Sequence, residues 1–146
     1  MKIAFRLPDG SVENMHADPL PDGTFRLDNS PFHTYGISFG DRFEVSKEEG
    51  RLFFSKIAAR GGHSTYRVKL PPGKSHDHFL EHWERFKALG CTFEGSGADE
   101  RRLYAIDIPP GTDVHAVYAL LEEGEAAGLW QFEEGHYAGG ESNGAG

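Results

Sequence analysis

Three histidines, His76, His78 and His82, lie close together in the middle of the chain. His78 and His82 are four residues apart, so in a helix they share one face, with Glu81 nearby as a candidate third metal ligand. A zinc site needs at least three protein ligands, and neither a cysteine nor a further histidine is close in the sequence. We therefore expect surface histidines without a metal or cofactor, and keep a transition-metal site as the weakest of three hypotheses.

Polar residue types also occur in an irregular stretch, residues 32–39, and around residue 63. Five of these side chains would meet if the two segments lay side by side: His33, Tyr35, Asp41, His63 and Ser64. A Ser-His-Asp hydrolase also needs its serine on a sharp turn near oxyanion donors, and the Gly-x-Ser-x-Gly elbow is missing. We therefore favour a structural role, in which His63 or Ser64 ties the linker to the first module.

Acidic side chains are concentrated in the second half of the chain. Residues 1–63 carry 8 Lys and Arg against 9 Asp and Glu, a balance of −1, whereas residues 64–146 carry 7 against 14, a balance of −7. Nucleic-acid binding depends on cations that neutralise phosphates, so we expect no nucleic-acid partner. Five glutamates either form a solvated face or steer a basic protein partner: Glu122, Glu123, Glu125, Glu133 and Glu134.

Short strands separated by turn residues account for the first half of the chain. The pattern of apolar residues and Asp-Gly turns predicts five strands, at residues 3–7, 12–17, 24–27, 42–46 and 52–58. No helix in this half is long enough to cover a sheet. We therefore predict that residues 1–63 form a small β-barrel, SH3-like or similar, that covers its own edges.

The second half changes to a mixed pattern of strands and helices. A strand at residues 65–70 precedes a helix that begins after Ser75 and ends at Gly90, with Phe79, Trp83 and Phe86 on its buried stripe. A hairpin of residues 91–94 and 102–108 follows. A second helix, capped by Thr112 or Asp113, ends at Gly128, and a last strand covers residues 129–133. This β-α-β-β-α-β order predicts a ferredoxin-like module over residues 64–137 within an α+β protein.

The predicted sheet of the second module has two different faces. Both helices would cover the face that carries Tyr104 and Trp130. The opposite face carries Arg67, Asp107 and Glu133, and we expect it to be solvated or to lean on the barrel, with opposite charges paired across strands. The tail, residues 138–146, is rich in glycine, and we expect it to be disordered.

Composition indicates the class of protein. One cysteine, Cys91, cannot form an internal disulfide, and the chain opens without a secretory leader pattern. Apolar stretches are much shorter than the roughly 20 residues that cross a bilayer, so we expect no membrane association. These features favour a bacterial cytoplasmic protein.

Two longer stretches of the sequence resemble a known family. Residues 17–45, ADPLPDGTFRLDNSPFHTYGISFGDRFEV, and residues 62–68, GHSTYRV, are similar to the bacterial family catalogued as domain of unknown function 4265. The resemblance extends to the LGCTFEG and DIPPG segments. It implies a small cytosolic protein and no particular activity. Within the matching stretches, the polar candidates for a ligand site are Asn29, His33, Tyr35, Asp41, His63 and Ser64.

The sequence therefore supports two main hypotheses. We favour a non-enzymatic binding or regulatory protein that engages a basic protein, as an immunity protein or a nuclease regulator does. The alternative is a hydrolase or small-ligand binder with its site at the junction of the two modules. Neither the partner nor the oligomeric state follows from the sequence.

Overall fold

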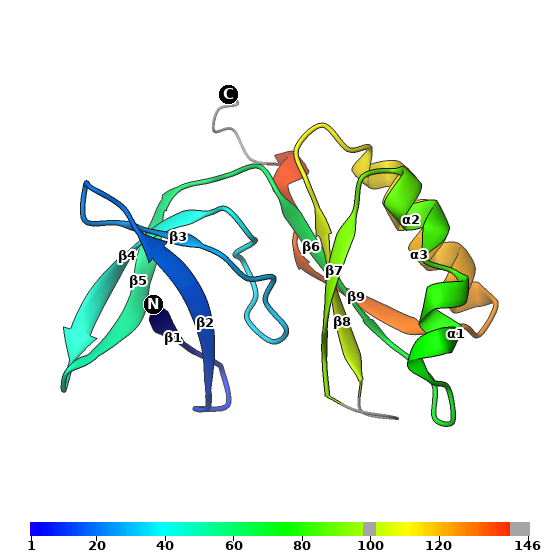
Figure 1. Ribbon diagram of the computed structural model, residues 1–146, viewed down its shortest axis with the longest axis horizontal. Coiled ribbons are helices and arrows are strands. Elements are labelled where there is room, and N and C mark those ends of the chain that lie inside the picture. The colour runs from blue at the N-terminus through cyan, green and yellow to red at the C-terminus, as the bar shows by residue number, and fades with distance from the viewer. Residues whose placement is uncertain (98–101, 141–146) are drawn as a thin grey trace.

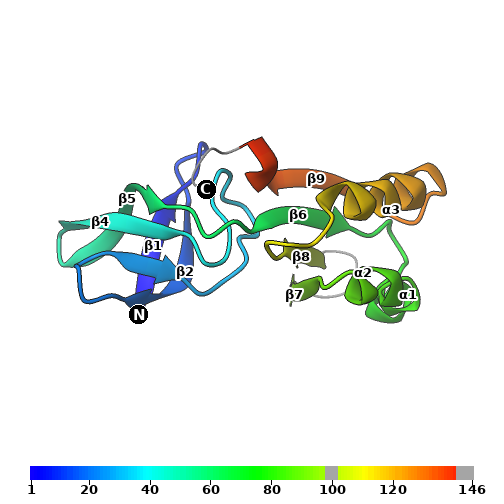
Figure 2. The same ribbon diagram turned by 90° about the horizontal axis from the view of Figure 1, so that it is seen from above.

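The computed structural model describes residues 1–97 and 102–140. It shows a mixed α+β protein with two sheets and three α-helices, arranged as two modules side by side (Figures 1 and 2). The helices lie on the side of the second sheet that faces away from the first module (Figure 1). The helices in the described residues fall short of the length and apolar character that a bilayer crossing requires.

The first module is a five-stranded sheet closed into a ring. Its strands are β1 (Lys2–Arg6), β2 (Val12–Pro19), β3 (Phe25–Leu27), β4 (Arg42–Glu48) and β5 (Arg51–Ala59). Consecutive strands pair antiparallel, and a parallel contact of Ala4 with Phe53 joins β1 to β5. Inward-facing Ile3, Phe5 and Phe43 are at most 1% exposed, so alternating apolar residues supply the core inside the ring.

The second module is a four-stranded antiparallel sheet with its helices on one face. Its elements are β6 (Ser64–Lys69), α1 (His76–Glu81), α2 (Glu84–Ala88), β7 (Thr92–Ser96), β8 (Leu103–Ile108), α3 (Val114–Ala126) and β9 (Gln131–His136). The strand order is β7-β8-β6-β9, which places β6 and β8 in the centre. Trp83, Tyr104 and Trp130 share one buried cluster, which confirms the prediction that the helices cover this face.

The first helix of the second module differs from the sequence prediction. Instead of one helix up to Gly90, the chain forms α1 and α2 with a break at His82 and Trp83. The amide nitrogens of these two residues donate to Phe79 and Leu80, three residues back, and this 3₁₀-type spacing tightens the chain. The predicted stripe survives the break, since Phe79, Trp83 and Phe86 are all buried.

Smaller differences concern the ends of elements. Of the two predicted caps of α3, Thr112 and Asp113, the structure uses Asp113. Its carboxylate accepts hydrogen bonds from the amides of His115 and Ala116. The last strand begins two residues later than predicted and extends to His136. Residues 138–140 of the predicted disordered tail form a 3₁₀ turn, and its remaining residues, 141–146, lie outside the described residues.

Candidate functional site

The connection between β3 and β4 joins the two modules. It lies against the face of the second sheet that is opposite the helices (Figure 1). Arg67 of β6, only 1% exposed, donates from Nη1 to the carbonyl oxygens of Pro31 and Thr34 at 3.3 and 2.9 Å, and from Nε to Glu133 at 2.8 Å. Its guanidinium carbon lies 4.5 Å from the centre of the Tyr35 ring. Arg67 therefore clamps the connection onto the sheet.

Two carboxylates hold the same connection from opposite sides. Glu13 of β2 accepts hydrogen bonds from the amide nitrogens of residues 32–34, at distances between 2.8 and 3.1 Å. Glu94 of β7 accepts from the amide of Ser30 at 2.7 Å and from the side chain of Asn29 at 3.4 Å. Charged acceptors satisfy several backbone donors here, so an irregular loop is held in one conformation.

A buried polar network continues this junction. The Ser38 hydroxyl lies 2.6 Å from the Thr65 hydroxyl and 2.7 Å from Nδ1 of His136. A serine beside a histidine can act as an activated nucleophile. Ser38 and Thr65 are 0% exposed and His136 is 6% exposed, so a substrate carbonyl has no access. The network therefore serves to join β6 and β9 to the first module.

Asp41, His63 and Ser64 of the predicted ligand site each bond to a different partner within the protein. Asp41, fully buried, accepts from the amide of Gly61 at 2.8 Å and from Arg60 at 3.0 Å. His63 instead contacts Asp107 through Nδ1 at 2.9 Å, while Ser64 accepts a hydrogen bond from the amide of residue 138.

The other three candidates of this set also bond within the protein. Tyr35 donates to Glu133 at 2.7 Å, the amide of His33 donates to Glu13, and the side chain of Asn29 contacts Glu94 and accepts from the amide of residue 16. These contacts support the structural role that the sequence analysis favoured for the junction. Sequence reasoning missed Glu13, Glu94 and Ser38, whose partners lie between 19 and 98 residues away in the chain.

The five glutamates of the predicted partner surface divide into two sets. Glu133 and Glu134 bond inside the molecule, the first to Tyr35 and Arg67 and the second to the Tyr66 hydroxyl at 3.1 Å. Partial burial raises the pKa of Glu133, but the hydrogen bonds from Tyr35 and Arg67, together with the Arg67 charge, outweigh it, and the net pKa lies below its usual value. These two glutamates therefore belong to the folded structure.

Glu122, Glu123 and Glu125 form the second set, which we call the acidic α3 surface. All three are exposed in the last turns of α3, a helix without lysine or arginine. Glu123 pairs with Arg85 of α2 at 2.5 Å, and the hydrogen bond and charge of Arg85 lower the pKa of Glu123. The surface is therefore acidic overall.

A buried tryptophan fixes the helix under this surface. The Trp130 side chain donates from Nε1 to the carbonyl of Leu121 at 3.0 Å. A methyl group on Gly124 would lie 2.2 Å from the Trp130 ring, so only glycine allows this close contact with α3. A cavity of about 620 Å³ lies beside it, and its walls include Glu125, Trp130 and Lys69.

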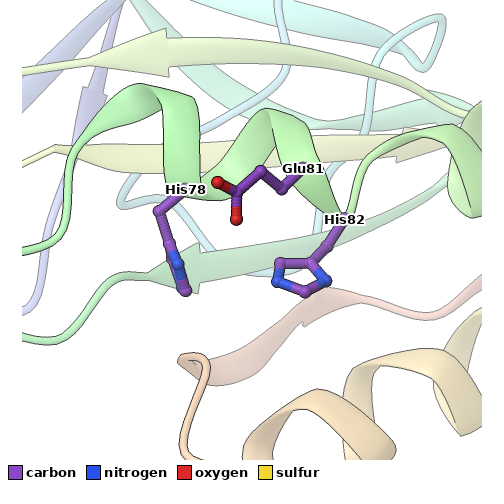
Figure 3. Close-up of side chains that lie close together, drawn as sticks. All are labelled: His78, Glu81 and His82. Atoms are coloured by element: carbon purple, nitrogen blue, oxygen red, sulfur yellow. The ribbon is translucent and has the colours of Figure 1, made fainter.

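The histidines predicted on the first helix occupy two different environments. His76 is half-buried, with its ring stacked on the Tyr104 ring and Nδ1 2.8 Å from the Tyr104 hydroxyl, so it is less exposed than the surface position that the sequence predicted. The other two lie with Glu81 on one side of α1, so that one candidate ligand atom of each residue is within 4.8 Å of the others (Figure 3). The structure thus brings together the three residues of the weakest hypothesis.

Comparison with known proteins gives a family and a fold. The family model described as Domain of unknown function (DUF4265) matches residues 13–132. The chain is also similar to a solved structure titled as the novel crystal structure of a hypothetical protein from Neisseria gonorrhoeae, with a TM-score of 0.74 and 18% sequence identity over 94% of this chain and 93% of the other. No curated protein matches the chain. At this identity the similarity shows a shared fold alone.

Proposed function

Since the chain belongs to the family of domain of unknown function DUF4265, we propose its function from its geometry: it is a small non-enzymatic binding protein. The acidic α3 surface engages a basic protein, as the surface of an immunity protein or a nuclease regulator does. The observation that carries the proposal is that these three glutamates are exposed on α3, in the helix layer on the far side of the sheet from the first module (Figure 1). Glu133 and Glu134 are exposed as well, but their carboxylates are bonded to Tyr35, Arg67 and Tyr66.

The position of Glu122 supports a role outside the fold. Within the described residues it has no hydrogen-bond or ion-pair partner. A negative charge near the C-terminal end of a helix opposes the helix dipole, so this carboxylate lowers the stability of α3. Residues that disagree with local stability are expected at functional sites, where another benefit offsets the cost.

The neighbouring cavity suggests how a basic partner is recognised. Glu125 belongs to both the acidic α3 surface and the cavity wall, and Trp130 forms another part of that wall. A lysine or arginine side chain of the partner would meet the Glu125 carboxylate beside the largely buried Trp130, with the Lys69 cation on the same wall limiting the attraction. Opposite charges around such an anchor would accelerate association and select the partner.

Charge reversal tests this proposal directly. The triple variant E122K/E123K/E125K is compared with E44K/E48K/E49K, which makes the same charge change on the exposed β4–β5 hairpin of the first module. Tagged proteins are used to capture ligands from a cell lysate at low and moderate salt. We expect the wild type and the hairpin variant to capture basic proteins at low salt and to lose them at moderate salt. The α3 variant should capture none at either salt concentration. Equal capture by both variants would contradict the proposal.

We also infer a finer classification for the two modules. The closed ring of five short strands supports an SH3-like or similar barrel, and the antiparallel order β7-β8-β6-β9 with helices on one face supports a ferredoxin-like unit. A bacterial, cytoplasmic protein remains our proposal on the basis of its composition. Localisation of a tagged copy in a bacterial host would test the compartment.

A further inference from the structure

His78, Glu81 and His82 converge at the end of α1, on the side that faces the connection between α3 and β9 (Figure 3). Their spacing of three and four residues places them on one helix face. Both imidazoles are half-buried and the carboxylate is exposed. Nothing in the proposed partner surface uses these three side chains, so they require a separate explanation.

The surroundings of His78 determine which ring nitrogen is available. Its Nε2 lies 3.1 Å from the carbonyl oxygen of Leu129. A carbonyl oxygen only accepts hydrogen bonds, so Nε2 is the donor, and in the neutral imidazole the lone pair is then on Nδ1. Histidines that bind metals commonly donate their second ring nitrogen to a backbone carbonyl in this way, which fixes the ring and its tautomer.

His82 is held at the break between α1 and α2. Its backbone has φ −111° and ψ 0°, outside regular helix geometry, and its ring packs edge-on against Trp130 with ring centres 6.0 Å apart. The centres of the His78 and His82 rings are 5.4 Å apart. A 3₁₀ segment inside a helix often marks a functional position, and here it coincides with one of the converging side chains.

Glu81 supplies the negative charge of the group. In the described ranges 1–97 and 102–140 its carboxylate has no hydrogen-bond or ion-pair partner. The group thus contains two oriented imidazole rings and one carboxylate without a partner among the described residues. That composition is the His₂Glu set found in open, three-ligand zinc sites.

We propose that His78, Glu81 and His82 bind a divalent transition-metal ion of the zinc class. Imidazole nitrogen favours zinc, copper and nickel, whereas calcium and magnesium prefer oxygen donors alone. Ligands about 2.0–2.1 Å from a tetrahedral ion lie roughly 3.3 Å apart. The side chains reach that spacing from at most 4.8 Å by small rotations. A fourth position stays open for water or for a donor from a bound partner.

Calorimetric titration with Zn²⁺ of the chelator-treated, full-length protein tests the site. We expect one ion per chain. Loss of an outer-shell partner alone weakens metal sites about 10- to 100-fold, so we expect E81Q and H82A each to weaken binding at least about tenfold. E81Q is the cleaner variant, because Glu81 is exposed and its carboxylate has no hydrogen-bond or ion-pair partner among the described residues.

A matched control separates this site from adventitious histidines. The triple variant H16A/H33A/H115A removes three exposed imidazoles elsewhere and should bind Zn²⁺ as the wild type does. A second readout is tryptophan fluorescence, since the two tryptophans of the chain, Trp83 and Trp130, adjoin His82. Co²⁺ should quench it in the wild type and much less in E81Q. Absent binding, or binding lost in the control and kept in E81Q and H82A, would overturn the proposal.

Discussion

The two faces of the second sheet use polar residues in opposite ways. On the face toward the first module, Arg67, Glu94 and Glu133 all bond to groups that the fold brings to them. On the helix side, Glu122 is exposed in α3, and within the described residues it lacks a bonding partner. The junction therefore uses its charges for stability, whereas the helix layer carries charges that stability does not explain.

This difference indicates where to look for function in a protein of this kind. The junction contains the residue types expected of a catalytic site, including a serine next to a histidine, yet their contacts are internal. The helix layer contains carboxylates and histidines whose bonding capacity is partly unused. Side chains on a rigid surface that have unused hydrogen-bonding groups are a better indicator of a binding site than the mere presence of reactive residue types.

Replacing Arg67 with alanine should give the largest effect on the junction side of the comparison. The change removes the hydrogen bonds to Pro31, Thr34 and Glu133, and a hydrogen bond to a charged group contributes about 1.5–3 kcal/mol. Urea denaturation measures the loss. Lys69→Ala, two residues along the same strand and exposed, is the control and should change stability by less than about 0.5 kcal/mol. Similar losses for both variants would contradict the clamp.

Glu13→Ala should give the next largest effect. The substitution leaves the amides of residues 32–34 without their acceptor, and a hydrogen bond to a charged group contributes about 1.5–3 kcal/mol. We expect a loss of about 2 kcal/mol in the free energy of unfolding, together with faster hydrogen exchange in these three amides. Unchanged exchange there would mean that Glu13 does not hold the loop.

The charge of Glu133 gives the junction a dependence on pH. Its pKa is lower in the folded protein than its usual value of 4.5, so its contribution is fully present above pH 4.5 and is lost as the pH falls through the folded-state pKa. Denaturation of wild type and E133Q at several acidic pH values measures this contribution. The difference in stability between them should shrink as the pH falls below 4.5, and a constant difference would contradict the assignment.

Glu122→Lys should give the smallest effect, with the opposite sign. Replacing an anion by a cation near the C-terminal end of α3 complements the helix dipole, so we expect the melting temperature to rise by about 1–3 °C. The same variant should bind a basic partner more weakly. A fall in the melting temperature would show that Glu122 stabilises the fold. The helix layer would then not differ from the junction in how it uses its charges.

The sequence predicted the elements better than it predicted the junction. Local patterns specify the buried stripe of the first helix and the cap at Asp113 because the residues involved are neighbours along the chain. Arg67 and Lys69 alternate on β6 in the same way, yet one is buried and the other is exposed. The β3–β4 connection covers only part of the face, and sequence periodicity contains no information about that coverage.

The histidine group illustrates the same limit on a smaller scale. Spacing along the helix identified His78, Glu81 and His82 as candidates, but it did not predict that the neighbouring His76 is half-buried and stacked on Tyr104. The contact of His78 with Leu129, 51 residues away, depends on the packing of α3 and β9 against α1. Residue types and spacing thus suggested the candidates, and the tertiary contacts show how each ring is held.

Site-specific photo-crosslinking tests most directly the claim that the helix layer, and not the junction or the first module, is the binding surface. A photoreactive residue is placed at exposed Ala126, one turn after Glu122, and separately at exposed Ser46 of β4 as the reference position. The account predicts crosslinks from position 126 to a basic protein, abolished by E122K/E123K/E125K, and none from position 46. Crosslinks to the same protein from position 46, unaffected by that triple substitution, would contradict it.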